Sequence, residues 1–157
     1  MPPELRTVDD TRAWGARLGA LLRAGDLLVL TGGLGAGKTT LTQGIAQGLG
    51  VRGPITSPTY VIARVHPSEV DGPDLVHVDA YRLGGLAELD DLDLDASLET
   101  AVTIVEWGRD VAERLSEGYL EVTLSGHETR IVELVGHGAR WAAPVAVAAL
   151  DDLVSLA

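Results

Sequence analysis

Eight residues in the first third of the chain have the types and spacing of a phosphate-binding loop. The stretch Gly32-Gly-Leu-Gly-Ala-Gly37-Lys38-Thr39 matches the pattern G-x-x-x-x-G-K-[ST] in full. Glycines let successive backbone N–H groups point at phosphate oxygens, the lysine reaches the β- and γ-phosphates, and the final hydroxyl can ligate Mg²⁺. Lys38 is the only lysine among the 12 Lys and Arg residues, which suits a place that needs a compact ammonium. The motif therefore predicts nucleotide binding.

The segments on either side of the motif predict the elements that this chemistry needs. Residues 26–30 form an apolar run typical of a buried strand, and an amphipathic helix is expected from Lys38 to Leu49, with Gly50 as its end. The positive N-terminal end of such a helix favours a bound phosphate. A flexible glycine-rich loop with an incidental lysine is the alternative, and the order strand, loop, helix disfavours it.

Two acidic residues stand where a magnesium site is expected. Asp79 closes the apolar run 75–79, and Glu106 directly follows the run 102–105. Carboxyl ends of parallel strands form the ligand-binding edge of α/β sheets, and Mg²⁺ prefers oxygen ligands. The structural alternatives are a helix cap or an ion pair with Arg82 for Asp79, and a solvated strand end for Glu106.

The remaining pattern predicts an α/β fold of the P-loop NTPase class, with a partly parallel central sheet, antiparallel edge strands and flanking helices. Thr7 and Asp10 have the spacing of a capping box that opens a helix. We assign residues 1–140 to a single P-loop ATPase domain and 141–157 to a weakly specified C-terminal tail. The other expected elements are a strand at 60–65, helices at 86–98 and 108–118, and a hairpin of strands 119–124 and 129–135.

Composition and charge restrict the classes of function. The chain has 157 residues, no cysteine and a net charge of −11, and its start lacks a signal segment. We expect a cytoplasmic protein with no membrane segment. The acidic balance opposes direct binding of nucleic acid, so a partner is expected to hold any RNA. GTPases read guanine through Asn-Lys-x-Asp, and this chain contains no asparagine.

Several segments, in their order along the chain, together resemble the TsaE (YjeE) family, over roughly residues 5–140. They are the phosphate-binding loop, Ser57-Pro58-Thr59, His77-Val-Asp79-Ala-Tyr81-Arg82, Glu106-Trp107 and the opening helix with Thr11. Members of that family are small bacterial ATPases needed to form threonylcarbamoyladenosine in tRNA. One departure is Gly33, where the family usually has Asp.

The resemblance implies a site for ATP or ADP with Mg²⁺. Lys38, Asp79 and Glu106 are the implied catalytic residues. Magnesium would be held by Thr39 and Glu106, with Asp79 as a further acidic contact. Thr59 would sense the γ-phosphate, Thr11 would lie near the base, and the phosphates would be held by Gly35, Ala36, Gly37, Lys38, Thr39 and Thr40. His77 is interpreted as a polar position of its strand, with a positioning role as the lesser alternative.

The resemblance also names partners, the tRNA threonylcarbamoyl transferase subunit TsaD and its companion TsaB, with tRNA reached only through that complex. We found no clear arginine finger in the sequence, although Arg82 is a candidate, so slow ATP hydrolysis that the complex stimulates is expected. A small-molecule kinase of the P-loop class and an ATP-switched binding module remain alternative functions.

Overall fold

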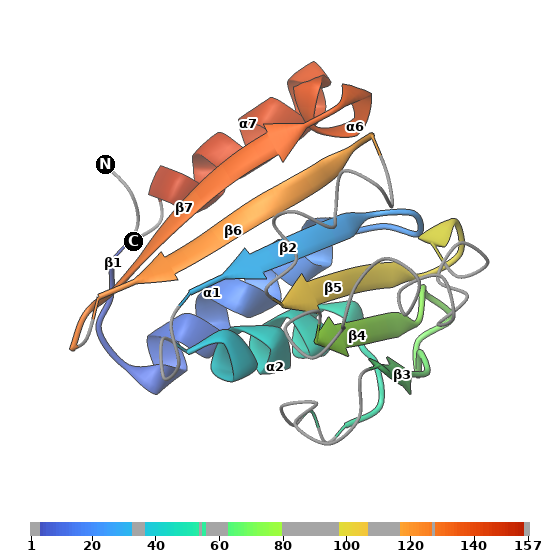
Figure 1. Cartoon of the computed structure of the whole chain (residues 1–157), viewed down its shortest axis with the longest axis horizontal. Coiled ribbons are helices and arrows are strands. Elements are labelled where there is room, and N and C mark those ends of the chain that lie inside the picture. The colour runs from blue at the N-terminus through green and yellow to red at the C-terminus, as the bar shows by residue number, and fades with distance from the viewer. Residues whose placement is uncertain are drawn as a thin grey trace.

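A mixed β-sheet forms the centre of the molecule (Figure 1). The computed structural model describes residues 4–32, 37–53, 55, 63–79, 98–106, 117–126 and 128–155. Within these ranges the sheet has seven strands in the order β1-β7-β6-β2-β5-β4-β3. The strands are β1 (Glu4–Leu5), β2 (Leu27–Thr31), β3 (Ala63–His66), β4 (Leu75–Asp79), β5 (Val102–Glu106), β6 (Tyr119–Ser125) and β7 (Arg130–His137).

The strand directions confirm the predicted sheet. β6, β2, β5 and β4 run parallel to one another, whereas β7 pairs antiparallel with β6, β1 with β7, and β3 with β4. The hairpin of β6 and β7 is longer than predicted, and the two-residue β1 was not predicted. The strand expected at 60–65 is described from Ala63 onward. The expected helices at 86–98 and 108–118 lie almost wholly outside the described residues.

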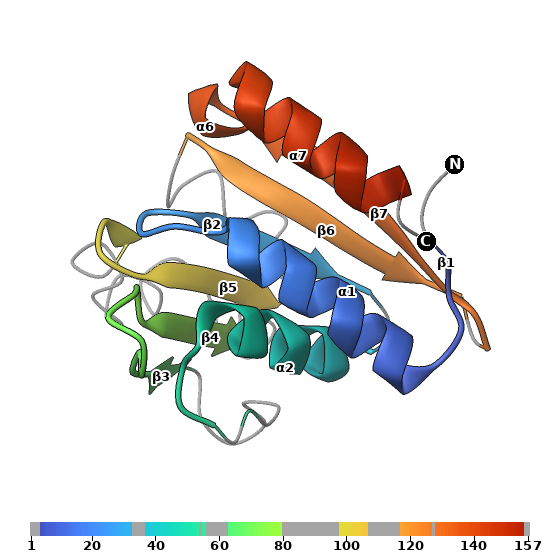
Figure 2. The same ribbon diagram turned by 180° about the vertical axis from the view of Figure 1, so that it is seen from behind.

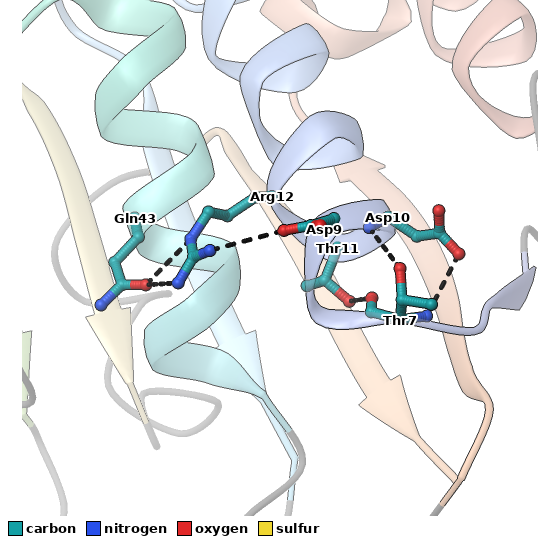
Figure 3. A network of polar contacts seen from close by, with 6 residues as sticks. All are labelled: Thr7, Asp9, Asp10, Thr11, Arg12 and Gln43. Carbon is teal, nitrogen blue, oxygen red and sulfur yellow. Dashed lines mark hydrogen bonds and ion pairs between the residues drawn. The ribbon is translucent and has the colours of Figure 1, made fainter.

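Helices α1 (Val8–Leu21), α2 (Lys38–Leu49) and α7 (Pro144–Ser155) lie on one face of the sheet (Figure 2). The predicted capping box opens α1: the Thr7 hydroxyl accepts from the Asp10 N–H at 3.0 Å, and the Asp10 carboxylate accepts from the Thr7 N–H at 3.1 Å (Figure 3). Every described helix is too short or too polar to cross a lipid bilayer.

Four glycines bring α1 and α2 unusually close together. A Cβ on Gly15 of α1 would lie 2.8 Å from the Leu41 carbonyl oxygen of α2, and one on Gly44 of α2 would overlap the Arg12 backbone of α1. Gly19 and Gly48 make equally close contacts. Because real Cβ atoms do not approach backbone oxygens this closely, the pairing requires glycine on both helices. It fixes the position of α2, which begins at Lys38.

Buried apolar side chains cover both faces of the central strands. Leu28 and Leu30 of β2 belong to a cluster that includes side chains of α1 and α2, whereas Leu27 and Val29 belong to a second cluster on the opposite face. Both faces of a central parallel strand are buried, which explains the continuous apolar run in its sequence.

The C-terminal segment, whose structure the sequence left open, folds into the short helix α6 (Ala139–Ala142) and then α7. The Trp14 indole of α1 donates to the Leu153 carbonyl of α7 at 3.3 Å. Trp141 is buried, and Arg140 donates to the buried Asp26 carboxylate at 3.0 Å. These contacts attach the segment to the helical face.

Candidate functional site

The described ends of the phosphate-binding loop lie between β2 and α2. Gly37 adopts a left-handed backbone, with φ +100° and ψ +17°, which strongly favours glycine. The Lys38 ammonium donates to the Gly32 carbonyl at 2.6 Å, and the residue is 8% exposed, so the lysine side chain reaches back to the residue that follows β2. Residues 33–36, including the predicted phosphate contacts Gly35 and Ala36, lie outside the described residues.

The first turn of α2 presents further groups at this end of the loop. Thr39 and Thr40 are half-buried there. The N-cap of α2, Gly37, offers no side-chain oxygen to the first N–H groups of the helix. An uncapped helix start of this kind is suited to accept an anion such as phosphate.

The two predicted acidic positions end neighbouring strands beside the loop. Leu30 of β2 is in register with Glu106 of β5, and Glu106 is in register with Asp79 of β4. Glu106 alternates along β5 with Val105, which belongs to the cluster on the opposite face, so Glu106 faces the side of the sheet that carries α2. The register therefore brings the backbones of Asp79 and Glu106 together, although the Asp79 side chain lies outside the described part.

Glu106 is a buried carboxylate with a defined partner. It is 4% exposed, and its Oε2 lies 2.7 Å from Nε2 of His77, which is fully buried. No described group of three or more His, Asp or Glu side chains forms a preformed metal site. One buried carboxylate beside a phosphate loop instead fits Mg²⁺, which proteins hold through one or two carboxylates together with substrate phosphates.

Thr11 lies in the first turn of α1. Its side chain is buried, and its hydroxyl donates to the Thr7 carbonyl at 3.3 Å (Figure 3). Contact between Thr11 and a nucleotide base stays a prediction. Thr59 and Arg82 are outside the described residues.

Arg130 is a residue near the loop that the sequence analysis missed. Its Nε lies 3.6 Å from the place that a Cβ on Gly37 would take, and its Nη1 donates to the Gly126 carbonyl at 3.1 Å. β6 runs parallel to β2, so the turn between β6 and β7 reaches the edge of the sheet from which the loop leaves. The only signal in the sequence was an arginine at the start of the second hairpin strand.

Together, the parallel centre of the sheet, the loop between β2 and α2, and the acid on the adjacent strand define a P-loop NTPase fold. A crystal structure of Bacillus subtilis YdiB has the same architecture, with a TM-score of 0.72 and 29% identity, covering 98% of this chain and 93% of that one. The family model described as threonylcarbamoyl adenosine biosynthesis protein TsaE matches residues 5–132. The chain therefore belongs to the TsaE family.

Curated relatives agree with this assignment. The chain is 59% identical to the tRNA threonylcarbamoyladenosine biosynthesis protein TsaE of Streptomyces coelicolor over 138 residues, covering 83% of this chain and 93% of the relative. It is 54% identical to the Mycobacterium tuberculosis protein of the same name, with 81% and 82% covered. For the Bacillus subtilis protein of that name the identity is 36%, and 87% of each chain is covered.

Proposed function

We propose that this protein is a Mg²⁺-dependent ATPase that serves as an accessory subunit for threonylcarbamoylation of adenosine in tRNA, in the cytoplasm. Membership of the TsaE family and the names of the relatives support the pathway. The observation that carries the proposed chemistry is the register of β2 and β5, which sets the buried Glu106 beside the strand that leads into the loop of Lys38. P-loop NTPases hold Mg²⁺ with an acidic strand residue beside the loop, and this position of Glu106 supports the same role.

The residues present fit ATP or ADP with Mg²⁺. The left-handed Gly37 and the uncapped start of α2 suit a polyphosphate, and Thr39 with Glu106 offers the oxygen ligands that magnesium prefers. Asp79 is proposed as the further acidic contact, Thr59 as the sensor of the γ-phosphate and Thr11 as the neighbour of the base. The phosphates are assigned to Gly35, Ala36, Gly37, Lys38, Thr39 and Thr40.

The protein's own groups act mainly by orientation and charge. When bound, magnesium neutralises charge that develops on the phosphate oxygens. The Lys38 ammonium, which now donates to the Gly32 carbonyl, exchanges that acceptor for a phosphate oxygen. Glu106 or Asp79 orients the attacking water. An arginine finger contributes on the order of 10³–10⁵ in rate. If a partner supplies this arginine, the isolated protein hydrolyses ATP slowly.

The proposed partners are TsaD and TsaB of the tRNA threonylcarbamoyl transferase. The net charge of −11 opposes direct capture of tRNA phosphates, so tRNA contact belongs to the complex. ATP turnover would reset that complex rather than form the modification itself.

Phosphate release tests this function. The purified protein is assayed with ATP and Mg²⁺, alone and with TsaD and TsaB, beside a Lys38→Ala variant. We expect slow release alone, stimulation by the partners, and neither with the variant. Release that the partners do not change would contradict the accessory role. Phosphate transferred from ATP to a hydroxylated metabolite would instead favour a small-molecule kinase.

A further inference from the structure

β4 buries a histidine between two valines. His77 is 0% exposed and lies between Val76 and Val78, whose side chains belong to the cluster on the opposite face of the sheet. By strand alternation His77 therefore shares the helix-side face with Leu75 of the same strand. An imidazole in such a place costs free energy unless it is hydrogen-bonded, so its partner indicates its role.

Among the described residues, the hydrogen bond of His77 goes to one atom. Its Nε2 lies 2.7 Å from Oε2 of Glu106, while its Nδ1 has no partner within the described part of the chain. A carboxylate can only accept, so the proton of this bond is carried on Nε2.

This bond determines how Glu106 can act. One carboxylate oxygen, Oε2, is held by His77, which restrains the orientation of the carboxylate, and Oε1 takes no part in this bond. A glutamate side chain has three torsions, and this bond restrains them at its far end. Carboxylates that bind metals are commonly oriented by such a second hydrogen bond, and loss of the second partner typically lowers metal affinity or activity about 10–100-fold.

We propose that His77 is the positioning residue of the magnesium site: its Nε2–H holds Oε2 of Glu106 so that Oε1 faces the metal of the bound Mg²⁺–nucleotide. This inference rests on the proposed function, because it requires Glu106 to be a magnesium ligand. It assigns to a core histidine a task that strand composition alone does not reveal.

Nucleotide binding without turnover provides the first test. Affinity for a fluorescent ADP is measured in EDTA and then as Mg²⁺ is added, for the wild type, His77→Leu and His77→Gln. We expect similar affinities in EDTA, while His77→Leu requires about 10–100-fold more Mg²⁺ to reach half of the metal-dependent change. The glutamine amide can donate to Oε2, so His77→Gln should recover most of the wild-type response.

Thr103→Val is the matched control. Thr103 is fully buried on β5, and its hydroxyl has no hydrogen-bond partner among the described residues. Because valine has nearly the same shape, this variant should keep the wild-type Mg²⁺ dependence. In Glu106→Gln, replacing His77 by Leu should add little further loss, since His77 is proposed to act on Mg²⁺ only through the carboxylate that this variant lacks.

The inference is overturned if His77→Leu folds and its ADP affinity depends on Mg²⁺ as that of the wild type does. It is also overturned if Mg²⁺ does not change the ADP affinity of the wild type. If His77→Leu does not fold, His77→Gln decides: near-wild-type dependence supports the inference, and a tenfold or larger loss contradicts it. The ¹⁵N spectrum of the wild-type histidines needs no variant. A proton on Nε2 of His77 is expected, and an unprotonated Nε2 would contradict the proposal.

The two proposals fail separately. A protein that shows the predicted Mg²⁺ response with ADP but never releases phosphate from ATP, even with TsaD and TsaB, would refute the ATPase function and leave the role of His77 intact. If the His77→Leu variant hydrolyses ATP at the wild-type rate and its Mg²⁺ dependence is unchanged, only the role of His77 is refuted.

Discussion

Asp79 and Glu106, the last residues of β4 and β5, are paired directly across two parallel strands. The pairing depends on the register of the whole β4–β5 ladder, which starts with Leu75 opposite Val102. A slip of one residue would move Glu106 to the opposite face of the sheet, away from α2 and Lys38. The acidic side of the proposed magnesium site is therefore built by the sheet and not by a local loop.

Glu106→Gln tests whether hydrolysis needs this carboxylate. The amide oxygen can still accept from His77, so we expect the fold to survive. Loss of the charge that assists metal binding and water orientation should lower the rate of phosphate release about 10²-fold or more. Phosphate release and retained nucleotide binding are the measurements.

The same variant separates the proposed ATPase from an ATP-switched binding module. If Glu106→Gln binds ATP, does not hydrolyse it and still supports tRNA modification with TsaD and TsaB, the switch is the better account. Loss of modification together with hydrolysis favours the ATPase.

Gly44→Ala should destabilise the protein although alanine favours helices. A Cβ at Gly44 would overlap the Arg12 backbone, so α1 and α2 must separate. Because the overlap is with backbone atoms, we expect a cost toward the upper end of the about 1–3 kcal/mol typical of overpacking, more than the roughly 1 kcal/mol that alanine contributes in a helix. Urea unfolding gives the change in the free energy of unfolding.

Gly53→Ala is the control for Gly44→Ala. Gly53 is exposed, and a Cβ there would lie 3.8 Å from the Ile55 nitrogen, its nearest neighbour among the described residues. The expected change is below about 1 kcal/mol. If the two substitutions lower the free energy of unfolding equally, the loss in Gly44→Ala does not come from the close contact between α1 and α2.

Arg140→Ala should weaken the attachment of the C-terminal helices. Arg140 donates to both carboxylate oxygens of the buried Asp26, at 3.0 and 3.2 Å, and to the Leu21 carbonyl at 3.0 Å. Its removal leaves a buried carboxylate without its cation, which costs about 3 kcal/mol. Chemical denaturation of Arg140→Ala measures the cost.

Arg52→Ala provides the comparison for this ion pair. Arg52 faces Glu69 at 3.8 Å, and both side chains are exposed. Exposed pairs contribute about 0–1 kcal/mol, so this variant should unfold almost as the wild type does. A loss of stability as large as that of Arg140→Ala would contradict the claim that burial of Asp26 makes its ion pair with Arg140 important.

His66 predicts a component of stability that is lost in mild acid. Burial lowers the pKa of His66 below its ordinary value of 6.5, the hydrogen bond to the Arg52 carbonyl opposes this, and electrostatic interactions with His77 and Arg64 lower the pKa further. The unfolded chain then binds a proton more readily than the folded one. Stability is therefore full above pH 6.5 and falls as the pH drops toward the folded-state pKa, by at most about 1.4 kcal/mol per pH unit.

A His66→Gln variant isolates this contribution. The free energy of unfolding is measured between about pH 7.5 and pH 5.5 for both proteins. As the pH falls, the free energy of unfolding should decrease more for the wild type than for His66→Gln. The difference between the two proteins removes the contribution of the carboxylates, which titrate in both. If the free energy of unfolding depends on pH in the same way in both proteins, the predicted contribution of His66 is contradicted.

Local patterns in the sequence predicted much of the fold. The hydroxyl and carboxylate of Thr7 and Asp10 satisfy N–H groups within one helical turn, so their spacing alone identified the start of α1. The apolar runs before Asp79 and Glu106 marked strands for the same local reason, and the family resemblance, now confirmed, supplied the implied roles.

Contacts between distant segments were not predictable in this way. The bond of His77 to Glu106 joins residues 29 apart and depends on strand register, so the sequence favoured a polar strand position for His77 and gave a positioning role only as the lesser alternative. Arg130 approaches Gly37 only because β6 lies beside β2. The Leu153 carbonyl that receives the Trp14 indole comes from a segment of Ala and Val with little pattern of its own.

Calorimetry of Mg²⁺–ADP binding to the wild type and to Lys38→Ala tests the central claim most directly. The claim is that the loop before α2 grips a polyphosphate with the Lys38 ammonium. We predict saturable binding by the wild type and a loss of about 1.5–3 kcal/mol in the variant, roughly 10–150-fold in affinity. No heat of binding to the wild type, or equal affinity in the two proteins, would contradict it.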